Sequence, residues 1–130
     1  MPIPRVIRDR VRAEIDQELT VWVGRIVSEM RPERVILFGS AARGEAGEDS
    51  DIDVVVIAQS EASFFDRIGQ ALDLYQGRRE VQALVYTPAE WGKMLAEGRS
   101  FALTVSREGR VLYDTGGVGP AGFEPTTERL

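Results

Sequence analysis

The sequence predicts an α/β (α+β) domain in which a small mixed β-sheet is flanked by helices. Three observations favour this class: a long helical repeat of apolar residues at the start, short aliphatic runs that end at turns, and helix signals between those runs. The chain has 130 residues, of which 43% are hydrophobic and 28% charged, as expected for one globular domain with its own core. We expect this domain to cover residues 1–114.

The first element is predicted to be a helix over about residues 3–30. Its apolar residues recur every three or four positions and form one stripe: Ile7, Val11, Ile15, Leu19, Trp22, Ile26 and Met30. Packing of this stripe on a sheet is the favoured interpretation. Val23 and Val27 widen the stripe, which leaves room for a dimer or partner interface and a possible homo-oligomer.

Strands and helices then alternate. Strands are predicted at 34–38, 51–58, 80–86 and 110–114, and helices at 60–75, from 88 onward and around 101–107. The stretch Thr87-Pro88-Ala89-Glu90 is a capping box with proline at the first helical position. Residues 52–57 are apolar on both faces of their strand, which is typical of the middle of a covered sheet. Residues 115–130 are rich in Gly, Pro and Thr without periodicity, so a disordered tail is expected.

Composition excludes several classes of function. The absence of cysteine and histidine excludes disulfides, thiolate zinc sites and imidazole chemistry, and it favours a reducing, cytoplasmic location. The net charge of −5 argues against broad nucleic-acid binding. No stretch approaches the roughly 20 apolar residues needed to span a bilayer, so no membrane association is expected.

Two aspartates stand at the start of the second predicted strand. Asp51 and Asp53 point to the same face, about 6.6 Å apart along the backbone, because side chains alternate in a strand. Two such carboxylates repel each other unless a divalent cation lies between them, and hard oxygen ligands favour magnesium or manganese. Taken alone, the pair is more simply a polar strand start at the surface.

A Gly-Ser turn ends the preceding strand. Gly39 allows a tight turn and close approach of a ligand, and Ser40 can cap a short helix whose free N–H groups attract phosphate. Arg43 follows one turn later with a permanent positive charge. A phosphate cradle beside a carboxylate pair indicates a site for a magnesium nucleotide. Other interpretations of the aspartates do not fit, since an EF-hand needs further oxygen ligands and a P-loop needs GxxxxGK[ST].

Residues 37–54, LFGSAARGEAGEDSDIDV, resemble the GSxxRG…SDxD signature of the minimal nucleotidyltransferases. This family belongs to the DNA polymerase-β-like nucleotidyltransferase superfamily, and its fold agrees with the predicted element order. The resemblance implies that Gly39, Ser40 and Arg43 bind the nucleotide, and that Asp51 and Asp53 are catalytic ligands of Mg²⁺. It also implies transfer of AMP from ATP to a hydroxyl. Many minimal members are antitoxins that adenylylate a tyrosine of a partner HEPN-domain toxin.

The sequence departs from the family pattern at two places. The family offers a third carboxylate from the next strand, where this chain has Gln82, a neutral amide that cannot act as a base. Glu80 lies two residues earlier, about 6.6 Å away, and is a doubtful substitute. The arginine expected directly after the Gly-Ser pair is also absent. Arg78-Arg79 could supply charge instead, although a solvated turn is the favoured interpretation there.

The leading hypothesis is therefore a magnesium-dependent nucleotidyltransferase of a toxin–antitoxin pair, impaired to some degree by Gln82. The alternative is a catalytically degenerate binding module that neutralises its partner by stoichiometric contact. A transferase acting on small molecules is less favoured, because the chain lacks a second domain to hold such an acceptor.

Overall fold

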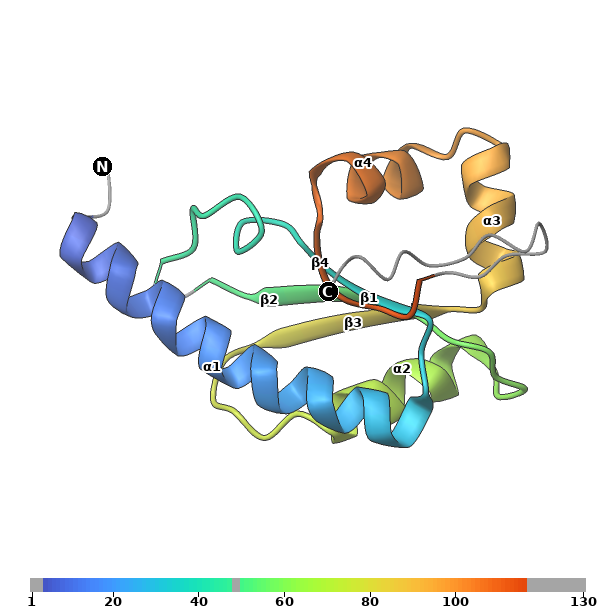
Figure 1. Ribbon diagram of the computed structural model, residues 1–130, viewed down its shortest axis with the longest axis horizontal. Coiled ribbons are helices and arrows are strands. Elements are labelled where there is room, and N and C mark those ends of the chain that lie inside the picture. The colour runs from blue at the N-terminus through green and yellow to red at the C-terminus, as the bar shows by residue number, and fades with distance from the viewer. Residues whose placement is uncertain (1–3, 48–49, 117–130) are drawn as a thin grey trace.

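The computed structural model describes residues 4–47 and 50–116 of the chain. The elements run in the order α1 (Arg5–Met30), β1 (Arg34–Phe38), β2 (Ile52–Ile57), α2 (Phe64–Asp73), β3 (Val81–Tyr86), α3 (Pro88–Ala96), α4 (Ser100–Glu108) and β4 (Arg110–Asp114) (Figure 1). The predicted α/β class and element order are confirmed. The expected tail lies outside the described residues, apart from Thr115 and Gly116.

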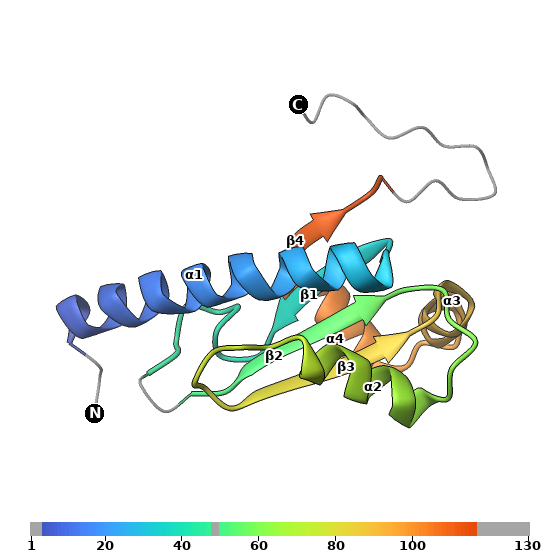
Figure 2. The same ribbon diagram turned by 90° about the horizontal axis from the view of Figure 1, so that it is seen from below.

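The four strands form one mixed sheet in the order β3-β2-β1-β4. β1 runs antiparallel to both β2 and β4, whereas β2 and β3 are parallel and are joined through α2. Helices α1 and α2 cover one face of the sheet, and α3 and α4 lie on the other (Figures 1 and 2). The antiparallel turn from β1 into β2 brings the end of β1 to the start of β2, and the parallel pairing brings the start of β3 to the same edge.

Helix α1 packs on the sheet through its apolar stripe, as the periodicity predicts. Its buried side chains recur at three- and four-residue steps: Val11, Ile15, Leu19, Trp22 and Ile26. The helix begins at Arg5 and ends where Arg31 takes the left-handed conformation, with φ of 49°, just before Pro32. No helix of the described residues is long and apolar enough to cross a membrane.

Strand β2 lies inside the sheet and contributes to two cores. Ile52, Val54 and Val56 are buried with the side chains of α1, while Val55 and Ile57 are buried with Trp91 on the opposite side. This two-sided burial confirms the prediction of a covered central strand. Because side chains alternate, Asp53 belongs to the face of Val55, which is the face that α3 and α4 cover.

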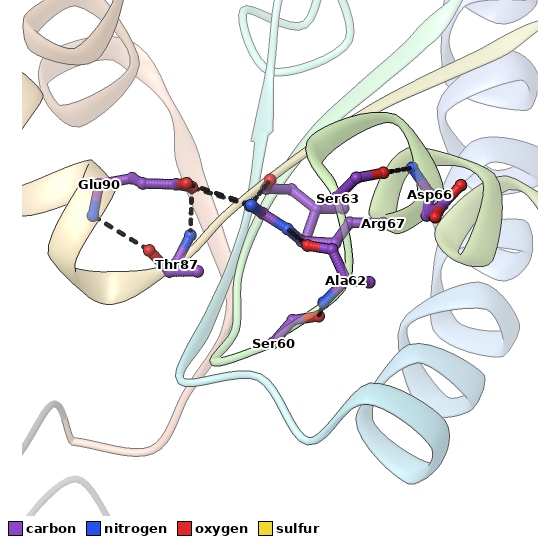
Figure 3. Close-up of polar contacts among 8 residues, drawn as sticks. Ser60, Ala62, Ser63, Asp66, Arg67, Thr87 and Glu90 are labelled. Atoms are coloured by element: carbon purple, nitrogen blue, oxygen red, sulfur yellow. Dashed lines mark hydrogen bonds and ion pairs between the residues drawn. The ribbon is translucent and has the colours of Figure 1, made fainter.

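Both predicted helix starts are present in the structure: α2 begins a few residues later than expected, and α3 begins at the expected residue. Helix α2 begins at Phe64 rather than near residue 60, because the Ser63 hydroxyl caps it by accepting the N–H of Asp66 at 3.1 Å. The capping box of α3 is confirmed: the Thr87 hydroxyl accepts the Glu90 N–H at 3.1 Å, and the Glu90 carboxylate accepts the Thr87 N–H at 2.9 Å (Figure 3).

An ion pair between a buried arginine and a partly exposed glutamate joins α2 to the start of α3 across the end of β3. The Arg67 guanidinium is 5% exposed and donates to both carboxylate oxygens of Glu90, at 2.8 and 3.1 Å (Figure 3). It also donates to the carbonyls of Ala62 and Val85. The hydrogen bond from Arg67, followed by that from the Thr87 N–H, lowers the pKa of Glu90. No local sequence pattern predicts this pair, whose members are 23 positions apart.

Candidate nucleotide site

Three chain segments meet at one edge of the sheet and bring the predicted site residues together. Strand pairing sets Phe38, the last residue of β1, opposite Asp53 on β2, and sets Asp53 opposite Gln82 on β3. Gly39 and Ser40 follow β1 directly, and Asp51 precedes β2. The turn, the aspartates and Gln82 therefore occupy adjacent positions although 43 residues of sequence separate Gly39 from Gln82.

The turn after β1 lies directly against a carboxylate. Gly39 has φ of +78°, a conformation that side chains rarely adopt, and a Cβ built on it would lie 2.7 Å from Oδ2 of Asp53. The positive φ favours glycine here, and any larger residue would also force the Asp53 carboxylate or the turn to move. The turn therefore runs beside the Asp53 carboxylate.

Residues 40–44 form successive turns rather than the short helix that Ser40 was expected to cap. The turns are closed by the N–H of Arg43, which reaches the Gly39 carbonyl at 3.3 Å, and by the N–H of Glu45, which reaches the Ser40 carbonyl at 2.9 Å. Within the described residues, the N–H groups of Ser40 and Ala41 have no acceptor. Successive free N–H groups in a turn make an anion-binding concavity, as a helix start would.

The aspartate pair is electrostatically strained without a cation. Asp53 is half-buried, and burial together with the neighbouring charge of Asp51 raises its pKa above the ordinary value of 3.8. A divalent cation removes both penalties at once. One or two carboxylates, completed by substrate phosphates and water, form the donor set that Mg²⁺ usually takes from a protein, so the chemistry of this pair fits one such ion.

Among the residues that the structure describes, no third carboxylate joins this pair. Gln82 is exposed and lies beside Asp53, at the position where the family resemblance implies a third carboxylate. Glu80 lies two residues before Gln82, just outside β3, and its backbone carbonyl accepts the Ile52 N–H at 3.0 Å. Among the residues that the structure describes, no group of three or more acidic, histidine or cysteine side chains is placed to hold a metal ion. Glu80 is therefore not part of a three-carboxylate cluster with Asp51 and Asp53.

Arg43 does not approach the aspartates in this structure. Its side chain is exposed, and its Nε donates to Oε1 of Glu45 at 3.0 Å. Such an exposed pair is worth about 1 kcal/mol or less, so the guanidinium remains available to an anion that binds at the turn.

The favoured interpretation of Arg78-Arg79 as a solvated turn is wrong for Arg79. Its side chain is only 11% exposed and its Nη2 lies 3.0 Å from Oε1 of Glu14 on α1. The neighbouring Tyr75 accepts the Arg79 N–H at 3.0 Å and donates to Glu18 at 2.6 Å; burial and this hydrogen bond raise the Tyr75 pKa to about 12. These contacts anchor the loop that leads into β3 and Gln82. The partners of Tyr75 and Arg79 lie 57 and 65 positions away in the sequence, so no local pattern predicts these contacts.

Comparison with known proteins identifies the family and the fold. The sequence pattern of the nucleotidyltransferase domain family matches residues 22–98, which is more than half of the chain. A candidate protein adenylyltransferase of Methanocaldococcus jannaschii is 35% identical over 83 residues, covering 64% of this chain and 80% of that protein. The crystal structure of a candidate nucleotidyltransferase from Sulfolobus solfataricus superposes with a TM-score of 0.62 at 21% identity, over 83% of this chain and 87% of that one. The protein therefore belongs to the nucleotidyltransferase domain family, and its mixed sheet with flanking helices is the fold of that family.

Proposed function

We propose that the protein transfers AMP from a magnesium complex of ATP to a hydroxyl of a protein, and that the acceptor is a tyrosine of a partner HEPN toxin. The observation that carries the proposal is the position of the Gly39 turn beside Asp53, whose pKa is raised by burial and by the charge of Asp51. The name of the archaeal relative supports AMP as the transferred group and a protein as the acceptor. Likeness to minimal antitoxins in residues 37–54 supports the toxin as partner, and an ATP-dependent role suits the cytoplasm.

In this proposal the chain contributes positioning and charge. The N–H groups of Ser40 and Ala41 hold phosphate oxygens, with Arg43 joining them once it leaves Glu45. Asp51 and Asp53 hold Mg²⁺, which supplies Lewis-acid stabilisation of the phosphate charge when bound. The acceptor oxygen forms a bond to the α-phosphorus, the bond from that phosphorus to the bridging oxygen breaks, and pyrophosphate leaves. The hydroxyl proton passes to Asp53 or to solvent, because the amide of Gln82 cannot take it.

The experiment is transfer of label from ATP carrying it on the α-phosphate. We expect labelled AMP on the co-expressed partner and release of pyrophosphate, both dependent on magnesium. Asp53→Asn keeps the shape of the side chain but removes its charge, so transfer should disappear, whereas Asp73→Asn on the exposed side of α2 should leave it intact. Label that follows ATP carrying it only on the γ-phosphate would overturn the proposal in favour of a kinase. Replacing the modified tyrosine of the partner by phenylalanine identifies the acceptor.

One observation favours a second candidate, a binding module that neutralises its partner without chemistry. Asp53 has the neutral Gln82 as its neighbour on β3, and the described residues offer no third carboxylate around the pair. Tight partner binding by both the native protein and Asp53→Asn, without transfer of label in either, would establish this second function.

A further inference from the structure

A groove of about 480 Å³ separates α1 from β4, the edge strand of the sheet. It is lined mainly by apolar and small side chains: Thr20, Val23, Gly24 and Val27 from α1, and Leu112 and Tyr113 from β4. The ion pair between Asp16 and Arg110, at 2.9 Å, also borders it. The groove belongs to the α1 face of the sheet, whereas Asp53 belongs to the opposite face, so the proposed nucleotide site does not use it.

The side of α1 that lines this groove can pack against the same side of a second copy of α1 that runs in the opposite direction. A second copy of α1 that crosses antiparallel, centred between positions 23 and 24, sets Val23 against the partner's Gly24 and Val27 against the partner's Thr20. Val23 then meets a glycine, and Val27 meets the slightly smaller and more polar Thr20. A two-fold axis repeats both contacts, as a symmetric interface requires.

The charged residues at the two ends of this stretch favour the same antiparallel register. Asp16 stands at one end of this stretch of α1, and the exposed Arg31, which directly follows the last helical residue, stands at the other. The antiparallel register sets Asp16 beside the partner's Arg31 at both ends, whereas a parallel arrangement would bring like charges together. Arg110 contacts only Oδ1 of Asp16, so Oδ2 can accept from the partner. Complementary charges of this kind fix the register of an interface more than they raise its affinity.

We propose that the groove is the interface of a homodimer in which α1 packs antiparallel on α1 of a second copy. Helix pairing is favoured over extension of the sheet, because the pairing of β4 with β1 is broken by an irregularity at Val35 and Ile36, and such irregularities protect strand edges from pairing. The two nucleotide sites stay on the outer faces of the dimer and remain accessible to a partner.

The test uses the full chain and two matched glycine variants in sedimentation velocity over a wide range of protein concentration. A Cβ on Gly24 meets nothing within 4 Å, so Gly24→Arg fits the monomer but places a long charged side chain in the interface. Gly92→Arg on α3 introduces the same side chain at an equally open helical position away from the groove. We expect a dimer for the native chain and for Gly92→Arg, and a folded monomer, with unchanged helical circular dichroism, for Gly24→Arg.

Reversing the charge of single arginines provides an independent test of the interface. Arg31→Glu should weaken the dimer about tenfold at low salt by creating two like-charge contacts, while Arg107→Glu on the opposite face should have no effect. A native chain that stays monomeric at every concentration overturns the proposal. So does a Gly24→Arg variant that dimerises as the native chain does. Dimerisation only after removal of residues 117–130 would also overturn it and would assign the groove to that segment.

Discussion

The turn at Gly39 runs beside Asp53: a Cβ on Gly39 would lie 2.7 Å from Oδ2 of Asp53, so a side chain fits there only if the carboxylate or the turn moves. This proximity links the two halves of the proposed site, the phosphate-binding backbone and the metal-binding carboxylate. A side chain here would displace the carboxylate or push the turn away from it. Either movement separates the phosphate position from the metal position.

We therefore expect Gly39→Ala to lose most of its affinity for magnesium ATP. Gly44→Ala is the matched control, because Gly44 also has a positive φ, of +73°, but a Cβ there meets nothing within 4 Å. Both variants carry a left-handed alanine, which costs about 1–2 kcal/mol of stability. Calorimetric titration with magnesium ATP compares them, and equal affinity in the two variants would show that Gly39 is only a turn residue.

Asp53 should make the protein less stable while it serves the site. Its pKa is raised by burial and by Asp51, so the folded state holds a proton that the unfolded state has already released. Stability therefore falls as pH rises from the ordinary value of 3.8 through the raised folded pKa, and the penalty persists at neutral pH. Without metal, Asp53→Asn should raise the free energy of unfolding at pH 7 and lose this advantage below pH 3.8.

Urea unfolding of the two proteins across this pH range measures the effect. Asp73→Asn, an exposed change of the same chemistry, should alter stability by about 0.5 kcal/mol or less. Added magnesium should stabilise the native protein and leave Asp53→Asn unchanged. A native protein that is more stable than Asp53→Asn without metal at pH 7 would contradict the raised pKa.

The Arg67–Glu90 pair should matter to stability through Arg67, which is the buried partner. Glu90→Gln leaves a buried guanidinium without its carboxylate, although the carbonyls of Ala62 and Val85 still accept from it. We expect a loss of about 2 kcal/mol, the typical cost of removing a charged hydrogen-bond partner from a buried group. Since Arg67 lowers the Glu90 pKa, the native stabilisation is present above the ordinary pKa of 4.5 and is lost as pH falls through the lowered value.

Glu97→Gln is the control for this pair, because Glu97 contacts Lys93 and Arg99 at the surface. Its loss should cost about 0.5 kcal/mol or less. Chemical denaturation at pH 7 and at pH 3 separates the two variants. Equal stabilities for Glu90→Gln and Glu97→Gln at pH 7 would show that Arg67 finds other partners.

Most of the fold could be predicted from patterns of residues that lie close together in the sequence. The apolar stripe of α1, the two-sided burial of β2 and the capping box of α3 each depend on residues close in sequence, and all three are confirmed. Boundaries were less certain: the helix expected over 60–75 begins at Phe64, where Ser63 caps it, and ends at Asp73, although the apolar spacing continues to Tyr75. A spacing pattern does not reveal which polar residue closes a helix.

Long-range polar contacts gave no such signal. Arg67 lies in the middle of an amphipathic helix pattern, and nothing in the sequence indicates that Glu90, 23 residues later, reaches it across the end of a strand. Arg79 follows another arginine in a polar loop, so burial against Glu14 depends on where α1 lies. The site residues come from three segments whose positions the strand register fixes, and their roles in catalysis remain predictions.

Gln82 is the position at which the enzyme and the binding module make different predictions. The register sets it beside Asp53, so Gln82→Asp places a third carboxylate where a metal ion and the acceptor hydroxyl are expected. A positioned base typically contributes about 10²- to 10⁴-fold in rate, so this variant should transfer AMP faster than the native protein. Gln82→Ala removes only a neutral amide and should change the rate little. Binding of magnesium ATP should be affected less, because Asp51, Asp53 and the Gly39 turn are unchanged.

Single-turnover transfer of labelled AMP to the partner measures both variants. Glu80→Gln is the control that separates the effect of position 82 from that of Glu80, which directly precedes β3. Because Glu80 stands outside any three-carboxylate cluster of the described residues, its replacement should leave the native rate unchanged. Rapid transfer by the native protein that collapses in Glu80→Gln would instead make Glu80 the working third carboxylate. Transfer that stays absent even in Gln82→Asp, with partner binding intact, would mean that the missing carboxylate is not what limits the chemistry, and would favour the binding module.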